Sequence, residues 1–93
     1  MVTGIAWYRP EQWEWLRQIS EDRRELEETH AEWRKFASQA LRNLRKAGVR
    51  VVKVDVDVKE LAQYCEREGL MINAWSRARF VTDSVAKLQA VRK

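Results

Sequence analysis

The chain has 93 residues, of which 45% are hydrophobic and 34% charged, and it contains three glycines and one proline. This size and composition predict a single folded domain over residues 1–93 and exclude both a disordered tail and a second domain. Cys65 is the only cysteine and leaves no internal disulfide, and neither a basic leader nor an apolar run of about 18 residues is present, so we expect a cytoplasmic protein.

The net charge of +4 is unevenly placed along the chain. Residues 1–69 hold 13 basic and 13 acidic side chains, whereas residues 70–93 hold five basic side chains and one acidic one. The basic excess of the last segment favours an anionic partner there, whether acidic protein, nucleic acid or lipid.

Two segments favour β-structure. Residues 5–8 are β-prone, and residues 50–58 alternate valine with charged side chains. Because unpaired backbone groups near a core are costly, the second segment needs a partner, which is either residues 5–8 or the same strand of a second copy. The alternation places Val52, Val54 and Val56 on a face that points into the core. Lys53, Asp55 and Asp57 lie on the opposite face, which is largely exposed to solvent.

Between these segments the pattern is helical. Pro10 suits the first position of a helix over residues 10–19, whose Trp13, Leu16 and Ile19 point inward. Ser20 then caps a new helix or marks a kink, and no helix breaker follows until Gly48. We therefore predict a long helix over residues 20–48, acidic in its first half and basic in its second. Its apolar stripe is Leu26, Trp33, Phe36, Ala37, Ala40, Leu41 and Leu44.

Two more helices are predicted after the second strand. Asp57 and Glu60 form a capping box for a helix over residues 58–68, which Gly69 ends. Asn73 is placed to cap a last helix that begins at residue 74. The inward side chains are Val58, Leu61, Ala62 and Cys65 in the first of these helices and Ala78, Val81, Val85 and Leu88 in the second.

Together the elements predict one β-α-α-β-α-α unit, a helix-dominated α+β fold in which a two-stranded ribbon packs on helices. Such a ribbon is marginally stable alone and needs a helical layer on its inner face. One strand edge stays open unless a second subunit covers it, so we expect a homodimer.

No residue pattern predicts catalysis, a cofactor or a metal site. His30 is the only histidine and lies on an apolar stripe, which favours a half-buried structural role over a general base or ligand. Asp55 and Asp57 could together hold a hard cation or act as an acid–base pair, but helix capping and the neighbouring Lys53 explain them. Cys65 fits core packing. Phosphate-binding glycine loops, nucleophile elbows and zinc-ligand spacings do not occur in the sequence, so we expect no enzyme.

Five tryptophans are many for this length, and the apolar stripes account for only two of them. Trp7 lies on the N-terminal strand, and Trp15 is off the inward face of the first helix. Exposed tryptophans supply large contact area at interfaces, so both are candidates for contact with a protein partner. The alternative is that both side chains cover one side of a small hydrophobic core.

The start of the last helix interleaves aromatic and basic side chains. Trp75, Arg77 and Arg79 lie there, and Lys87 lies further along the helix. A nucleic-acid-binding helix carries side chains of these types for its contacts with phosphates and bases. The two last helices superficially suggest a helix-turn-helix, although their apolar link and the seven-residue separation of Ala62 and Gly69 do not fit that motif. A solvated helix face is the favoured alternative.

The segments IAWYRPEQW, ISEDRRELEETHAEW, KVDVDVKELAQYCEREG and ARF together resemble a family of small uncharacterised bacterial proteins. The resemblance spans most of the chain and implies a compact, free-standing cytosolic domain of about this length. It implies no activity, cofactor or binding residue.

The leading functional hypothesis is a non-enzymatic protein-interaction or adaptor module that uses exposed aromatic side chains and a free strand edge. The alternative is a nucleic-acid-binding protein that uses the basic last helix. Membrane association through that helix is disfavoured because its apolar face is needed in the core.

Overall fold

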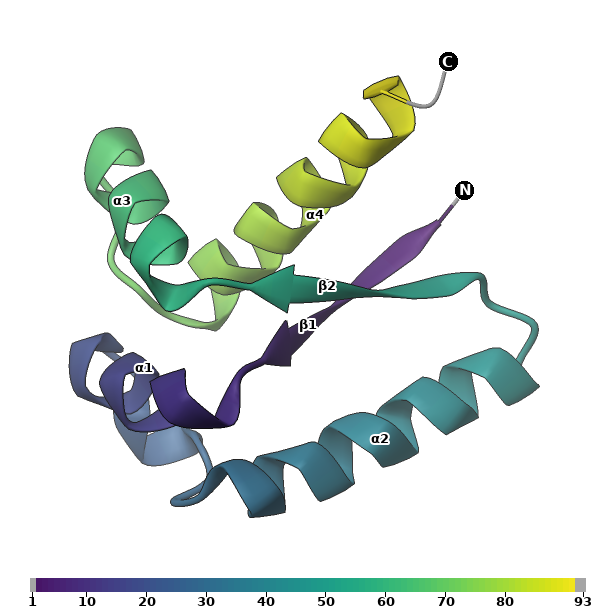
Figure 1. Ribbon diagram of the computed structural model, residues 1–93, viewed down its shortest axis with the longest axis horizontal. Coiled ribbons are helices and arrows are strands. Elements are labelled where there is room, and N and C mark those ends of the chain that lie inside the picture. The colour runs from purple at the N-terminus through teal and green to yellow at the C-terminus, as the bar shows by residue number, and fades with distance from the viewer. Residues whose placement is uncertain (1, 92–93) are drawn as a thin grey trace.

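A computed structural model describes residues 2–91 and confirms a small, helix-rich α+β domain (Figure 1). The described elements follow the predicted β-α-α-β-α-α order, with two short 3-10 turns at Pro10–Gln12 and Arg23–Glu25 added between the strands. Their bounds are β1 Thr3–Tyr8, α1 Trp13–Ile19, α2 His30–Lys46, β2 Val51–Val56, α3 Val58–Glu68 and α4 Ala74–Val91.

The two strands pair with each other in parallel, so the partner of the valine-rich strand lies in the same chain. Thr3 is opposite Val51 and Tyr8 is opposite Val56. A parallel pair needs a long crossover connection, which α1 and α2 supply here. In Figure 1, α2 lies on one side of the two strands, while α3 and α4 lie on the other.

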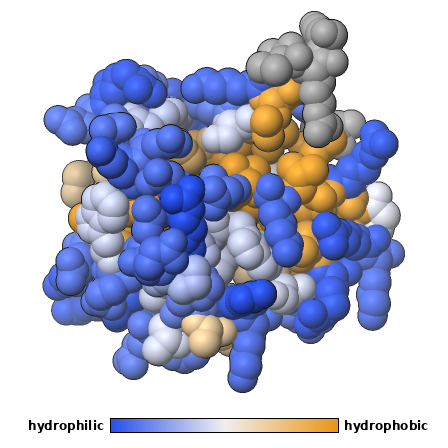
Figure 2. All heavy atoms as spheres, viewed as in Figure 1, coloured by the Kyte–Doolittle hydropathy of each residue, from blue (hydrophilic) through white to orange (hydrophobic). Residues whose placement is uncertain are grey.

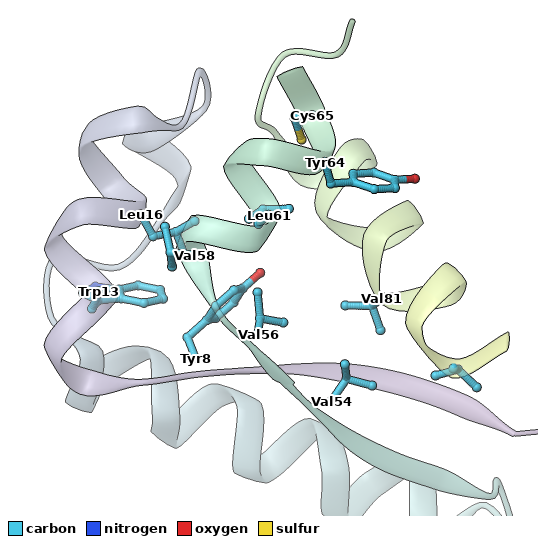
Figure 3. Close-up of a cluster of buried hydrophobic side chains, with 11 residues drawn as sticks. Tyr8, Trp13, Leu16, Val54, Val56, Val58, Leu61, Tyr64, Cys65 and Val81 are labelled. Atoms are coloured by element: carbon cyan, nitrogen blue, oxygen red, sulfur yellow. The ribbon is translucent and has the colours of Figure 1, made fainter. Parts of the chain in front are cut away.

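The core lies between the strands and the helices α1, α3 and α4 (Figure 3). Side chains on one face of the sheet point into it, because residues two apart in a strand share a face. Gly4 belongs to this face and allows α4 to approach closely, since an added Cβ would lie 2.6 Å from Val85 Cγ2. The most enclosed core side chains are Leu16, Val56, Val58, Leu61, Cys65 and Ser76.

The prediction that one helix runs over residues 20–48 is wrong at its first end. Ser20 has extended backbone and ends α1, and α2 begins only at His30, where the Thr29 hydroxyl accepts a hydrogen bond from the Glu32 amide over 3.2 Å. Tertiary contacts hold the intervening residues out of the helix. The Glu27 carbonyl accepts a hydrogen bond from the Trp13 indole, and the Asp22 carboxylate binds α4.

Five predicted inward side chains are exposed instead. Val52 of β2 is 39% exposed, whereas Val54 and Val56 on the same face are buried. Phe36 is 67% exposed and Ala40 is also exposed, because α2 reaches the strands only through a narrow strip that includes Trp33, Ala37 and Leu41. In α4, Val81 and Val85 are buried, whereas Ala78 borders an open groove and Leu88 lies beyond the packed part of the helix. In α3 the unpredicted Tyr64 is buried, and its hydroxyl donates a hydrogen bond to Asp83.

The predicted bounds of α3 and the predicted start of α4 are confirmed, but the capping box of Asp57 and Glu60 is not formed. The Asp57 side chain accepts hydrogen bonds from the Lys59 amide and from the Gln12 side-chain amide, and not from the Glu60 amide. The Gln12 side-chain oxygen accepts from the Val58 amide over 2.9 Å, which ties α3 to the start of α1. Gly69 ends α3 at φ 68°, and the Asn73 side chain accepts from the Ser76 amide at the start of α4.

Candidate functional site

A groove runs along the free edge of β1, with α2 forming one wall and α4 the other. Its volume is about 430 Å³. Gly4, Ile5, Ala6 and Tyr8 form the floor, and both helices run antiparallel to β1, since His30 and Arg77 lie near Tyr8 while Val85 lies near Gly4. The walls are apolar and built mainly of small side chains, which include Ala37, Ala74, Ala78 and Val81.

The free edge of β1 presents backbone hydrogen-bonding groups to this groove. In a parallel pair, alternate residues direct both their N–H and C=O groups toward the neighbouring strand. The Thr3 amide donates to the Arg50 carbonyl over 2.8 Å, so Thr3, Ile5 and Trp7 pair with β2. Gly4, Ala6 and Tyr8 therefore direct their groups into the groove, and no partner for those of Gly4 and Ala6 is found among residues 2–91.

One end of the groove is closed by a buried ion pair. Arg77 is 9% exposed and donates to both carboxylate oxygens of Asp22, over 2.8 and 2.7 Å, and to the Ser20 hydroxyl. This hydrogen bonding holds the pKa of Asp22 below its ordinary value, and burial raises the pKa of the neighbouring Tyr8 to about 12. The guanidinium is thus neutralised by Asp22 and does not offer a free charge to the groove.

An aromatic cluster fixes the same end of β1. Trp33 packs against the rings of Trp7, Tyr8 and Trp13 at centroid distances of 5.4, 5.2 and 5.4 Å. His30 is half-buried beside them, and its Nε2 lies 2.7 Å from the Tyr8 carbonyl oxygen. This carbonyl group at the edge of β1 therefore already has a hydrogen-bonding partner. The geometry gives His30 a structural contact, as the sequence predicted.

The two tryptophans predicted to contact a protein partner have different surroundings. Trp7 is half-buried, because its ring packs on Trp33 and lies under the Lys53 ammonium at 4.2 Å. Trp15 is 40% exposed on α1 and does not line the groove. The structure therefore brings neither indole to the free strand edge.

The four residues predicted to bind nucleic acid do not form one basic surface. The burial of Arg77 against Asp22 corrects the prediction for that residue. Arg79 pairs with Glu68 over 3.0 Å and lies over the exposed Trp75 ring. Two of the four residues, Arg77 and Arg79, are therefore paired with carboxylates. Lys87 is exposed and lines a different hollow, between α3 and α4.

The remaining candidate residues are engaged in contacts of the fold. Asp55 binds the Arg9 guanidinium through two hydrogen bonds, which lower the pKa of that carboxyl group. Asp57 caps α3, and Cys65 is a buried free thiol. Within the described part of the chain, no three histidine, cysteine or carboxylate side chains lie together as a metal site would require.

The groove was not predicted from the sequence, because its lining residues belong to no recognised binding motif. Taken one at a time, Gly4, Ala37 and Ala78 are residue types that are common wherever helices and strands pack. A signal was nevertheless present: small residues recur on both helices and on the strand that they flank. Only the parallel pairing, which fixes the edge that stays open, gives those residues a common location.

Comparisons with models of protein families, with curated proteins and with solved structures gave no match. Among the described residues, no helix has both the length and the apolar character needed to cross a bilayer.

Proposed function

We propose that the protein is a non-enzymatic interaction module that binds an extended segment of a protein partner along the free edge of β1. One observation carries the proposal: the unpaired backbone groups of Gly4 and Ala6 open into a groove with apolar walls. An added strand can satisfy such groups with its own backbone, as in other cases of peptide recognition at a sheet edge.

The walls restrict the chemistry of the bound segment. Successive side chains of an added strand point to opposite faces, so they would meet α2 and α4 alternately. The alanines on both walls leave room for aliphatic side chains, and the only charged lining residue, Arg77, is already paired. We therefore expect a segment of about five residues that is uncharged where it faces the walls.

Hydrogen exchange measured by NMR tests this binding mode directly. In the free protein the amides of Ile5 and Trp7, which pair with β2, should exchange slowly, whereas those of Gly4 and Ala6 should exchange rapidly. Peptides selected from a displayed library of linear sequences should protect the Gly4 and Ala6 amides. Protection confined to other parts of the chain would contradict binding at the β1 edge.

The variant Ala6→Pro supplies a sharper test. Proline at this position removes an N–H that points away from β2, so the pairing of β1 with β2 is retained, as is usual for prolines on edge strands. The proline ring would occupy the space that an added strand needs. We expect the variant to fold and to lose peptide binding, and equal binding by both proteins would rule out strand addition.

We also propose that two copies associate through the outer edge of β2. By the same alternation, Val51, Lys53 and Asp55 direct their backbone groups away from β1. An apolar patch that includes Val52 and Leu88 lies beside this edge, where α4 passes the strands (Figure 2). Antiparallel pairing of the two β2 strands would join the sheets and cover both patches, whereas the recessed β1 edge would remain available to a partner segment.

A further inference from the structure

The exposed side of α2 carries a row of basic side chains in two groups, near its start and near its end. Six of them lie within or just after this helix: Arg34, Lys35, Arg42, Arg45, Lys46 and Arg50. All six are exposed, and the sequence contains no acidic residue between Glu32 and Asp55. The net charge of residues 1–69 is zero and gives no sign of this row, because most of the acidic side chains in that range lie before residue 33.

The helical repeat places these charges on one side. Each residue advances about 100° around an α-helix, so the five basic residues of α2 fall within a sector of about 120°, which lies beside the strip that packs on the strands and begins next to Leu41. The row extends from Arg34 to Lys46, about 18 Å along the helix axis. In Figure 2 the surface over α2, in the lower part of the view, is mainly hydrophilic.

Within the part of the chain that the structure describes, these basic side chains form no ion pair. The ion pairs among the described residues use Arg9, Arg17, Arg77 and Arg79, and none involves the row on α2. Favourable contact with the helix dipole explains only Arg45 and Lys46, which lie in the last turn. Arg34 and Lys35 lie in the second turn of α2, beyond the reach of the dipole, so contact with the helix dipole does not account for them.

We propose that this row binds the phosphate backbone of a nucleic-acid duplex without reading its sequence. Four of the six side chains are arginines, whose planar guanidinium groups match phosphate oxygens through two hydrogen bonds each. A rigid row about 18 Å long covers roughly half a turn of B-form DNA. The complementarity is one of charge and shape, because the row has no side chains arranged for base-edge contacts.

Two other anionic partners fit the surface less well. Single-stranded nucleic acid is normally held by several aromatic rings on which bases stack, and Phe36 is the only aromatic side chain of α2 that is largely exposed. A membrane-bound helix inserts a broad apolar face, whereas the apolar side of α2 is used against β1 and β2. A duplex requires neither feature.

Fluorescence anisotropy with a labelled DNA duplex of about 20 base pairs tests the proposal. Release of counterions from four to six phosphates predicts that affinity falls about 10²- to 10³-fold between 50 and 200 mM salt. Duplexes of unrelated sequence should bind alike, and vesicles that contain phosphatidylserine should bind more weakly at the same salt. The absence of DNA binding at 50 mM salt, or preferential binding to the vesicles, would overturn the proposal.

A matched pair of variants separates the row from net charge. Arg42→Glu with Arg45→Glu and Arg79→Glu with Lys87→Glu change the net charge equally, but only the first pair alters α2. We expect the first variant to lose about tenfold or more in affinity, with a salt slope reduced by about 2, and the second to stay within about threefold of the original protein. Equal losses would contradict a site on α2. If charge reversal unfolds α2, the neutral pair Arg42→Gln with Arg45→Gln provides the same comparison.

Discussion

At the scale of single residues, the pair of Arg77 and Asp22 shows how burial changes the meaning of a charge. From sequence, Arg77 belongs to a basic helix and is a candidate for phosphate contact. In the structure its guanidinium lies in a nearly enclosed site, with side-chain exposures of 10% for Arg77 and 13% for Asp22. No sequence pattern links two residues that are 55 positions apart, so this correction required the tertiary structure.

Replacing Asp22 with alanine should destabilise the protein strongly. The change leaves a buried guanidinium without its counterion, which costs about 3 kcal/mol in comparable buried pairs. Urea denaturation at pH 7 measures the loss in free energy of unfolding. As a control, Asp55→Asn removes the carboxylate of a solvent-exposed pair and should leave the free energy of unfolding nearly unchanged. Similar losses in both variants would contradict the special role of the buried pair.

The same pair makes stability depend on pH. Hydrogen bonds from Arg77 lower the pKa of Asp22 in the folded state below its ordinary value of 3.8. The unfolded chain therefore binds a proton more readily, so this stabilisation is complete above pH values near 4 and is lost as pH falls through the folded pKa. Denaturation of the original protein and of Asp22→Asn should differ most near neutral pH and converge in acid. A constant difference down to about pH 2 would contradict the assignment.

At the scale of elements, most boundaries were predicted from local signals and one was not. The bounds of α3 and the start of α4 follow from Asp57, Gly69 and Asn73, whose side chains or backbone act within a few residues. The start of α2 is the boundary that was missed, although Thr29 and Glu32 have the spacing of a capping box and Ser20 has Arg23 at the corresponding position. Contacts of residues 20–29 with α1 and α4 hold these residues out of the helix, and local patterns do not contain such contacts.

Thr29→Ala should therefore weaken α2 at its true first turn. The variant loses the hydroxyl that accepts from the Glu32 amide, and loss of such a cap typically costs about 1 kcal/mol. Thr29→Ser keeps the hydroxyl and should retain most of the stability. Urea unfolding followed by circular dichroism measures both variants, and equal stability of the alanine variant and the original protein would argue that the helix begins elsewhere.

The contact of α4 with β1 is set by the absence of a side chain at Gly4. An added Cβ would lie 2.6 Å from Val85 and 2.8 Å from Val81, both in the side of α4 that is buried. We expect Gly4→Ala to cost about 1 to 3 kcal/mol through overpacking. Combining it with Val85→Ala should cost less than the two separate changes together, because the second creates space for the first. Additive losses in urea denaturation would contradict this close approach.

At the scale of the whole molecule, the sequence predicted the architecture better than the surface. The alternating valines, the helix caps and the three-to-four spacing were enough for the order of elements, because each acts locally. The open groove and the exposed sides of α2 and α4 depend on how far apart the helices lie. The radius of gyration of 13.5 Å, against about 12 Å expected for a compact chain of this length, reflects this open arrangement.

The last prediction concerns the number of copies in solution. If two β2 edges pair, sedimentation velocity should show a dimer that dissociates on dilution, and Val52→Lys with Leu88→Lys should shift the protein to monomer. Both side chains are partly exposed, at 39% and 55%, so their replacement should leave the fold intact, which circular dichroism can verify. Lysine on a sheet edge opposes edge-to-edge pairing because its charge would be buried in the interface. A charge-matched change on the exposed side of α3, Gln63→Lys with Glu66→Gln, also raises the net charge by two and should leave the dimer unchanged. A monomer at every concentration of the original protein would remove the dimer and leave the β1 groove as the proposed interaction surface.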